Sequence, residues 1–462
     1  EQIAQFLERY AEEIEACADE LVALAHRETA LPASPRLADV ELPRTTGQLR
    51  QAAAAAREGT WLAATIDTAN NIRACLAPIG PVCVFGPNNF PFAFGSVSGG
   101  DFAAAIAAAN PVIGKANTSH PGTTKRFAEA VLKALKQTDL PPATVQMLYR
   151  TSHDDGQRMV ADPRMGATGY TGSRAAGLTL KAAADAAGKP IYLELSSVNP
   201  VIILPGALAE RSDAIADELA TSGLLGTGQF CTKPGIVLLV ENDAARQFVA
   251  AIVGRYREAP HNTLLSEGVR DSLVENIRRL REAGAKSLTG DGQRLDEGIR
   301  CANTVLSVAG DQFLSDPPLF QTETFGNCLL LVNCVSISQL SEIVTQLEGN
   351  LTGSIYSDFG GADDAAYEQV APTLRQRVGR LLNDKMPTGV AVSPAMNHGG
   401  PYPATGHPGF TAVGLPRAMV RFATLHCYDQ VRPERLPIWL QDKNPNGKAW
   451  RSIDGVWTQG DV

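Results

Sequence analysis

The sequence lacks the features that hold a protein to a polyanion or a membrane. Its 462 residues include 41 Lys and Arg against 49 Asp and Glu, which gives a formal net charge of −8. Without a basic excess the chain has little with which to neutralise a nucleic-acid backbone or anionic lipids, so we expect neither as a partner. The most apolar windows, residues 200–204 and 235–240, are far shorter than the roughly 20 residues that span a bilayer.

Cysteine pairs of the kind that bind zinc are also absent. The eight cysteines contain no Cys-x-x-Cys pair, and none of the seven histidines has ligand spacing beside them. This argues against a zinc site and a disulfide framework, and we expect no metal. Reduced, buried cysteines are typical of a cytoplasmic protein, and Glu1 opens a helical pattern instead of a secretory signal.

The chain does show an alternation of strand and helix patterns. With 44% hydrophobic and 19% charged residues, it has the composition of a globular protein, and its length predicts about three domains. From Gly80 onward, we expect strands at residues 81–85, 111–115, 144–149, 165–170 and 191–195, with helices at residues 99–110, 122–137, 154–160 and 174–187. This alternation predicts a doubly wound, largely parallel sheet with ligand sites at the carboxyl ends of its strands.

A second alternating block begins near Val201. Expected strands at residues 201–204 and 236–240, with helices at residues 213–224 and 244–257, predict a second α/β domain. The first 58 residues show helical patterns with one apolar stripe each. Residues 60–76 lack that period and could form a hairpin, and the tail from Tyr428 is expected to lie against a larger body.

One cysteine lies in a distinctive loop. Residues 227–235 place Cys231 among glycines, directly before an apolar strand. Glycines at this density let backbone N–H groups turn toward a ligand, as a thiolate nucleophile with an oxyanion site requires. The same pattern is also typical of a tight turn around a buried cysteine.

Candidate polar residues lie at or just after the ends of three other expected strands. Glu194 is a carboxylate inside an apolar run, which suits a general base that activates water or an ion pair with a lysine. Asn89 lies in a loop fixed by prolines, where its amide is either an oxyanion donor or part of an Asx turn. Residues 171–177 open a helix whose first N–H groups could meet a pyrophosphate, although the G-x-G-x-x-G fingerprint is absent.

In this order the segments resemble the aldehyde dehydrogenase superfamily, from about Gln2 to the last residues. The family pattern of Asn-Phe-Pro, Lys, Gly-x-x-x-x-G, Glu-Leu, Gly-Gln-x-Cys and Glu-x-Phe-Gly is matched by Asn89-Phe90-Pro91, Lys115, Gly172 to Gly177, Glu194-Leu195, Gly228 to Cys231 and Glu323 to Gly326. Residues 228–232, 198–200 and 399–405 are similar to a narrower branch. That branch contains the α-ketoglutaric semialdehyde (2,5-dioxovalerate) dehydrogenases and a bacterial fatty-aldehyde dehydrogenase.

The resemblance implies catalytic roles for three residues. Cys231 would add to the aldehyde carbon, and Asn89 with the Cys231 N–H would hold the oxyanion. After hydride leaves for the nicotinamide, Glu194 would activate the water that hydrolyses the thioester, so the product would be an acid and not a coenzyme A ester. Ser196-Ser197 departs from the family's paired glycines and is expected to narrow the space near the nicotinamide or constrain the carboxylate.

The resemblance also implies the cofactor contacts. Glu323 and Phe325 would position the nicotinamide ribose and ring, and the glycine segment that would meet the pyrophosphate contributes Gly172, Ser173 and Gly177. Many NAD-preferring relatives carry a glutamate where Thr118 falls, and a carboxylate there repels a 2′-phosphate. A threonine hydroxyl can donate to that phosphate and Lys115 adds positive charge, so we expect NADP as cofactor, with NAD also possible. Both residues would otherwise be solvated loop residues.

The family likeness implies an α/β fold with three parts. These are a dinucleotide-binding domain at residues 1–195, a catalytic domain at residues 196–425, and a small β oligomerisation part formed by a hairpin at residues 60–78 and the tail 426–462. A homodimer or homotetramer is expected. Covering of an edge strand by a neighbouring subunit would also protect an otherwise open sheet.

The substrate is the least determined part of the interpretation. The expected substrate is a small-molecule semialdehyde such as 2,5-dioxovalerate; the alternatives are a medium- or long-chain fatty aldehyde, or a non-catalytic relative. Arg73 is a candidate for binding a distal carboxylate, or else a hairpin surface residue. Four phenylalanines could line an apolar tunnel or belong to the core: Phe92, Phe94, Phe230 and Phe410.

Overall fold

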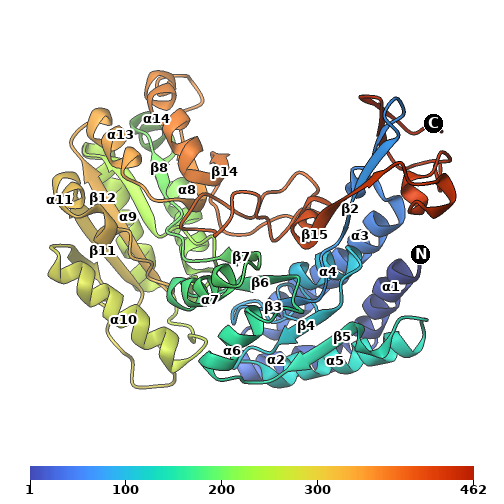
Figure 1. The fold of residues 1–462 in the computed structure, drawn as a ribbon. Helices are drawn as coiled ribbons and strands as arrows, with labels where there is room; N and C mark the ends of the chain where they lie inside the picture. The colour runs from blue at the N-terminus through green and yellow to red at the C-terminus, as the bar shows by residue number, and fades with distance from the viewer.

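The computed structural model describes residues 1–462 and contains three sheets. Figure 1 shows two α/β bodies beside each other, with the strands of a third sheet extending away from them near the C-terminus. None of the helices combines the length and the apolar character that crossing a bilayer requires.

The first sheet is fully parallel, in the order β5-β4-β3-β6-β7. Its strands are β3 (Val82–Phe85), β4 (Val112–Lys115), β5 (Val145–Leu148), β6 (Ala167–Thr171) and β7 (Ile191–Glu194). The chain builds outward from β3 in both directions, so the carboxyl ends of β3 and β6 lie at the switch point of a doubly wound sheet. The five predicted strands are confirmed to within two residues at each end.

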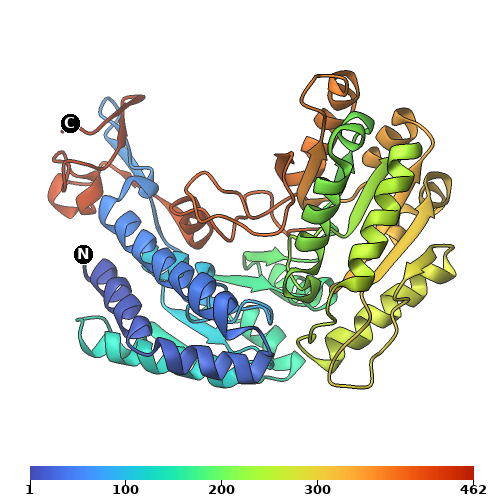
Figure 2. The same cartoon turned by 180° about the vertical axis from the view of Figure 1, so that it is seen from behind.

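Helices cover both faces of this sheet, which explains why its strands are almost continuously apolar. In β3, Val82 and Val84 belong to one core, while Cys83 and Phe85 belong to the core on the other face. The helices of the first face are α1 (Gln2–Glu15), α2 (Ala18–Thr29), α3 (Leu42–Glu58), α4 (Gly100–Ala107) and α5 (Pro121–Lys136). Those of the second face are α6 (His153–Val160) and α7 (Arg174–Ala186). Figure 2 shows α1, α2 and α3 on the outside of this body.

The second sheet has seven strands in the order β10-β11-β12-β9-β8-β13-β14 and is parallel except for β10. Its strands are β8 (Val201–Ile203), β9 (Ile236–Val240), β10 (Lys286–Thr289), β11 (Thr304–Ala309), β12 (Cys328–Cys334), β13 (Asn350–Tyr356) and β14 (Val378–Asn383). One face packs on α8 (Pro205–Leu224) and α9 (Asp243–Glu258). The other packs on α10 (Glu267–Glu282), α11 (Gly310–Ser315), α12 (Pro317–Phe320), α13 (Ile337–Thr345) and α14 (Asp364–Arg377). The predicted second α/β unit is confirmed.

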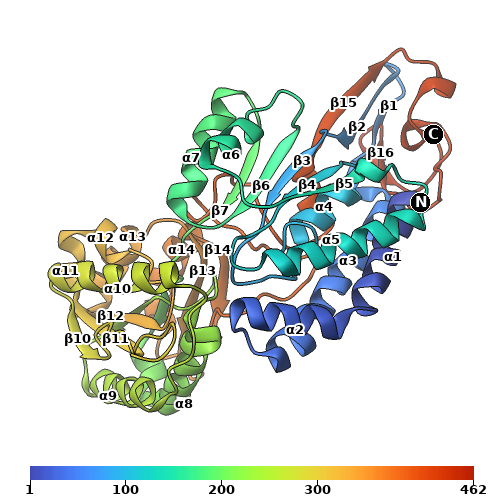
Figure 3. The same ribbon diagram turned by 90° about the horizontal axis from the view of Figure 1, so that it is seen from below.

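The third sheet joins distant parts of the chain, in the order β15-β2-β1-β16-β17. Its strands are β1 (Thr65–Asp67), β2 (Ile72–Pro78), β15 (Ala423–Asp429), β16 (Arg451–Ile453) and β17 (Val456–Thr458). The expected hairpin is present as β1 and β2, and the tail contributes a second hairpin that the sequence did not indicate. Figure 3 shows β2 and β15 projecting from the first body on the side away from the second sheet.

After β14 the chain returns to the first body through a long irregular segment. Gly406 N–H donates to the Leu193 carbonyl, and Leu195 N–H donates to the Ala404 carbonyl, so this segment lies along β7. Further on, the short helix η5 (Arg417–Phe422) contributes to the core of the first body. The return segment therefore passes the carboxyl end of β7, where Glu194 lies; the domain boundaries at residues 195 and 425 stay predictions.

Candidate active site

The loop that carries Cys231 is fixed by its backbone. Gly228 has a φ of +68°, and a Cβ there would collide with the Gly326 carbonyl oxygen, so only glycine fits this close approach. The Asn199 amide donates to the carbonyls of Cys231 at 2.8 Å and Lys233 at 2.9 Å. The thiol is thus held on a rigid turn between α8 and β9.

Three side chains from distant segments meet at this turn. His398 Nε2 lies 3.4 Å from Cys231 Sγ and 3.0 Å from Glu194 Oε1. The sulfur, imidazole nitrogen and carboxylate oxygen all lie within 4.8 Å of one another. The second carboxylate oxygen of Glu194 is buried without a hydrogen-bond partner. The fold therefore places a nucleophile and two proton acceptors in one cluster.

The sequence analysis missed His398. This residue lies in the irregular segment after β14, 167 positions from Cys231, and its ring packs edge-on against Phe94 with centroids 5.7 Å apart. Its backbone N–H donates to Thr411 Oγ1. The available signal was its position directly before the motif at residues 399–405.

The electrostatics of the cluster keep the thiol protonated in the absence of a bound ligand. Burial raises the pKa of Cys231 well above its ordinary value, and the negative charge of Glu194 raises it further, while Arg44 opposes the shift. A thiol in this state needs a nearby base before it can act as a nucleophile. His398 Nε2 can accept that proton in the tautomer that carries its hydrogen on Nδ1; in the other tautomer Nε2–H donates to Glu194.

The loop at residues 86–91 brings Asn89 to the same site. Its Nδ2 donates to the Gln229 carbonyl at 2.9 Å, which leaves a second amide N–H for a ligand. Arg36 forms an ion pair with the buried Glu41. It also donates to the Asn89 carbonyl and so holds the loop in place. The Cys231 N–H makes no hydrogen bond within the protein, so two donors are available to an oxyanion.

Cys231, Glu194 and Asn89 line one cavity of about 410 Å³, together with Glu323 and Phe325. An adjoining cavity of about 1080 Å³ begins at the carboxyl ends of β3, β4 and β6. The two share the lining residues Pro87, Asn88, Thr171, Gly172 and Ser173. This continuous crevice has the size and the switch-point position of a dinucleotide site.

The larger cavity contains the residues expected at the adenosine end. Lys115 and Thr118 line it, and so does Arg150, which the sequence analysis did not single out. Burial lowers the pKa of Lys115, and the positive charge of Arg150 lowers it further. Gly177 lines neither cavity. A Cβ there would strike Leu195, so this glycine allows α7 to pack closely on the sheet, and its contact with a cofactor stays a prediction.

A buried lysine holds the loop that carries Glu323 and Phe325. Lys233 is 4% exposed, and its ammonium donates to the carbonyls of Thr324, Gly326 and Cys328 at 2.9, 3.2 and 2.7 Å. Burial lowers the pKa of Lys233. Burial also raises the pKa of Glu323. The Ser196 hydroxyl and, to a smaller extent, the charge of Lys233 act in the opposite direction and lower it.

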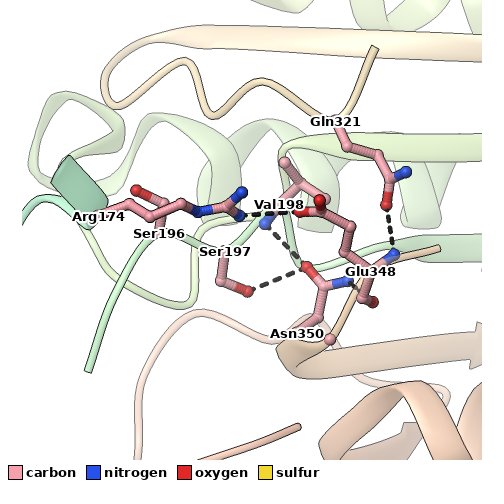
Figure 4. Close-up of a pocket in the computed structure, with 8 residues that line it drawn as sticks. Arg174, Ser196, Ser197, Val198, Gln321, Glu348 and Asn350 are labelled. Atoms are coloured by element: carbon pink, nitrogen blue, oxygen red, sulfur yellow. Dashed lines mark hydrogen bonds and ion pairs between the residues drawn. The ribbon is translucent and has the colours of Figure 1, made fainter. Parts of the chain in front are cut away.

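The two serines that replace the family's glycines act on different neighbours. The Ser196 hydroxyl lowers the pKa of Glu323. Ser197 Oγ accepts from the Leu351 N–H and lies 3.1 Å from Asn350 Oδ1, as Figure 4 shows for the second contact. Asn350 Oδ1 also accepts from the Val198 N–H, and the nearby ion pair Arg174–Glu348 measures 2.9 Å. Ser197 therefore fixes the turn after Glu194.

Three candidates for substrate recognition are placed elsewhere. Arg73 lies on β2 and donates to the Leu440 carbonyl and to Asp442, so its expected role at a distal carboxylate is wrong. Phe92 packs against Phe127 in the first core, and Phe410 is buried beside Arg421. Phe94 and Phe230 remain near the site: Phe94 contacts His398, and Phe230 lies one residue from the nucleophile and packs on Phe90.

Comparison with known proteins gives consistent matches. Residues 1–400 match the model of the aldehyde dehydrogenase family. The chain is 39% identical to α-ketoglutaric semialdehyde dehydrogenase 2 of Azospirillum brasilense, over 96% of this chain and 85% of the relative. It is 36% identical to the α-ketoglutaric semialdehyde dehydrogenase of Acinetobacter baylyi, over 99% of this chain and 88% of the relative.

Solved structures agree on the fold. The succinic semialdehyde dehydrogenase of Streptococcus pyogenes, in complex with NADP⁺, matches with a TM-score of 0.75 and 20% identity, over 93% of this chain and 90% of that chain. At this level of identity the likeness shows the shared architecture. The two relatives from Azospirillum and Acinetobacter are similar along almost the whole chain.

Proposed function

The chain belongs to the aldehyde dehydrogenase family, and from that premise we propose that it oxidises a semialdehyde, α-ketoglutaric semialdehyde first among them, to the acid. Family membership makes it an NAD(P)-dependent oxidoreductase that acts on small-molecule aldehydes. The observation that carries the proposed site is the contact of one His398 nitrogen with both Cys231 Sγ and Glu194 Oε1.

The first half of the proposed reaction forms a covalent adduct. His398 Nε2 accepts the Cys231 proton, and the thiolate adds to the aldehyde carbon. The oxygen of the resulting thiohemiacetal takes its hydrogen bonds from the Cys231 N–H and the Asn89 amide. A nicotinamide dinucleotide would supply the hydride acceptor, and Glu323 and Phe325, which line the same cavity as Cys231, would hold it there.

The second half hydrolyses the thioester that remains on Cys231. Glu194 removes a proton from water, which attacks the thioester carbonyl and releases the acid and the thiol. The free Oε2 of Glu194 supports this role because it is buried and has no partner in the protein. We propose that the cluster works without a metal, since Cys231 must be free to form a carbon–sulfur bond.

The substrate assignment rests on the two relatives named for α-ketoglutaric semialdehyde, at 39% and 36% identity over nearly the whole chain. Medium- and long-chain aldehydes are the alternative, which the aromatic side chains of Phe94 and Phe230 near the site favour. Assays with a substrate that ends in a carboxylate and with one that ends in a methyl group distinguish these two substrate classes.

NADP is the proposed cofactor, with NAD as a second substrate. Lys115 and Arg150 both line the larger cavity, and Thr118 lies between them in sequence without adding a negative charge. Two cations beside a hydroxyl suit the extra phosphate of NADP, since ionised partners give the strongest hydrogen bonds. A carboxylate at position 118 would instead favour NAD.

We propose a homodimer or homotetramer in a reducing, cytoplasmic compartment. The strands β15 and β17 are open edges of the third sheet, and they expose Leu425 at 68%, Val456 at 66% and Trp457 at 55%. Open apolar edges of this kind are normally covered by another chain. All eight cysteines are free thiols, as a reducing compartment requires.

Steady-state kinetics test the proposed function. The purified protein is assayed with α-ketoglutaric semialdehyde and with octanal, each with NADP⁺ and NAD⁺, and the carboxylic acid is identified by mass spectrometry. Cys231→Ser should abolish formation of reduced cofactor. Cys427→Ser, which alters an exposed thiol on β15, should leave it unchanged. Turnover that survives in Cys231→Ser overturns the assignment of the nucleophile.

A further inference from the structure

Arg44 has an unusual environment for a charged side chain. It lies in the first turn of α3, its guanidinium stands 5.2 Å from the centre of the Phe94 ring, and Nη1 donates to the Val390 carbonyl at 2.7 Å. Its Nε and Nη2 atoms are buried and have no hydrogen-bond partner. Buried donors without partners are costly, so a ligand that accepts from both would be favoured.

Other arginines buried near the first core have carboxylates of their own. Arg36 lies 2.7 Å from Glu41, and Arg421 lies 2.8 Å from Asp101. No carboxylate of the protein lies within ion-pair distance of Arg44, and a single backbone carbonyl is its only acceptor. The positive charge of Arg44 is therefore left without an anion in a half-buried position.

Arg44 interacts electrostatically with the nucleophile. Burial lowers the pKa of Arg44, and of the groups that oppose this shift Cys231 in its ionised form acts most strongly, with Glu41 and Glu194 also contributing. The Phe94 ring that lies beside Arg44 also packs on His398, which in turn contacts Cys231. Arg44 is thus one aromatic ring away from the catalytic cluster.

The loop beside Arg44 is tied to the nucleophile segment. Arg380 donates to the carbonyls of Pro387 and Gly389, and the Gly389 N–H donates to Thr232 Oγ1, next to Cys231. The following residue, Val390, receives the bond from Arg44. These contacts hold the residues just before Val390, so they connect Arg44 through the Val390 carbonyl to the segment that carries Cys231.

We propose that Arg44 determines substrate specificity by binding the distal carboxylate of the semialdehyde while its aldehyde carbon lies at Cys231. The N–H groups of Nε and Nη2, which have no partner in the protein, match the two oxygens of a carboxylate. Guanidinium groups bind carboxylates in this bidentate way. The role rests on the proposed oxidation of a semialdehyde. It makes Arg44, and not Arg73, the residue that distinguishes such a substrate from an uncharged aldehyde.

A matched pair of substrates tests this role. The compounds 5-oxopentanoate and pentanal have the same carbon chain and differ in the terminal carboxylate. Loss of a charged hydrogen bond predicts that Arg44→Met raises the KM for 5-oxopentanoate about 10- to 100-fold. Because the charge of Arg44 also lowers the pKa of Cys231, its loss should lower kcat for both substrates. The KM for pentanal should change by less than about twofold, since pentanal has no group for Arg44 to bind. Arg50→Met removes an exposed charge of α3 that pairs with Glu15, and it should alter neither substrate.

Each other outcome overturns the role of Arg44 or its premise. An equal rise in KM for both substrates would make Arg44 structural, and no change in KM for either would exclude it from binding the carboxylate. A wild-type enzyme that oxidises pentanal and not 5-oxopentanoate would overturn the semialdehyde function itself. If thermal unfolding shows that Arg44→Met does not fold, Arg44→Lys is the second variant. It keeps the positive charge but cannot form the bidentate hydrogen bonds of a guanidinium. That variant should raise the KM for 5-oxopentanoate alone.

Discussion

Glu194 Oε1 lies 3.0 Å from His398 Nε2 inside the protein, where the two side chains are 2% and 1% exposed. The same nitrogen is 3.4 Å from Cys231 Sγ, so the imidazole stands between the two groups that act in different halves of the reaction. When His398 holds the thiol proton, the carboxylate stabilises the imidazolium. Glu194 must leave this contact, or use its free oxygen, before it can activate water.

Removal of the imidazole should slow adduct formation most strongly at neutral pH. Because burial raises the pKa of Cys231, the thiol is protonated there, and His398→Gln should lower the single-turnover rate roughly 100-fold. As pH rises toward the thiol pKa, the thiolate fraction grows about tenfold per unit and the defect should shrink. Stopped-flow formation of NADPH across pH measures this.

A second histidine of the return segment is the control. His407 is exposed and its Nδ1 accepts from the Gly409 N–H, so His407→Gln should leave the pH profile unchanged. A His398→Gln defect of constant size from neutral to alkaline pH would contradict a role in deprotonating the thiol.

Loss of the carboxylate should separate the two halves of the reaction. Glu194→Gln keeps the size of the side chain but removes the base, so hydrolysis should slow by roughly 100-fold or more while the first hydride transfer persists. One equivalent of NADPH should form in a burst, and intact-protein mass spectrometry should find the acyl group on Cys231. Glu348→Gln, in the ion pair with Arg174, should retain turnover. A burst-free, inactive Glu194→Gln would contradict this order of events.

The sequence predicted the strands of the first sheet because short, β-branched apolar runs that alternate with helical stretches are typical of buried strands. That pattern also predicted that Glu194 lies at the end of β7. It could not predict the roles of His398 and Arg44. A lone histidine in an irregular segment and an arginine in the first turn of a helix have no local sequence signature. Their roles depend on contacts across the fold: His398 lies 167 positions from Cys231, and Arg44 donates to a carbonyl 346 positions away.

The buried ammonium of Lys233 should be required for cofactor affinity. Lys233→Met removes three charged hydrogen bonds to the loop of Glu323 and Phe325, so we expect lower thermal stability and a KM for NADP⁺ raised by about tenfold. The rate at which iodoacetamide alkylates Cys231 should stay near the wild-type value. Lys181→Met alters an exposed pair with Asp185 and serves as the control. An unchanged KM for NADP⁺ would show that the loop does not depend on Lys233.

Cofactor preference should depend on the positive charges of the larger cavity. Lys115 lines it together with Arg150, and burial and the charge of Arg150 both lower the pKa of Lys115. A 2′-phosphate between them would relieve this repulsion, whereas the 2′-hydroxyl of NAD would not. Lys115→Met should therefore raise the KM for NADP⁺ about tenfold and leave that for NAD⁺ within about twofold. Lys125→Met, in an exposed pair with Glu129 on α5, provides a matched loss of charge.

The difference in KM for NADP⁺ between wild type and Lys115→Met should also shrink as salt is added, since screening weakens the attraction between the cations and the phosphate. A loss of equal size with both cofactors would mean that Lys115 binds a part of the dinucleotide common to the two and does not select between them.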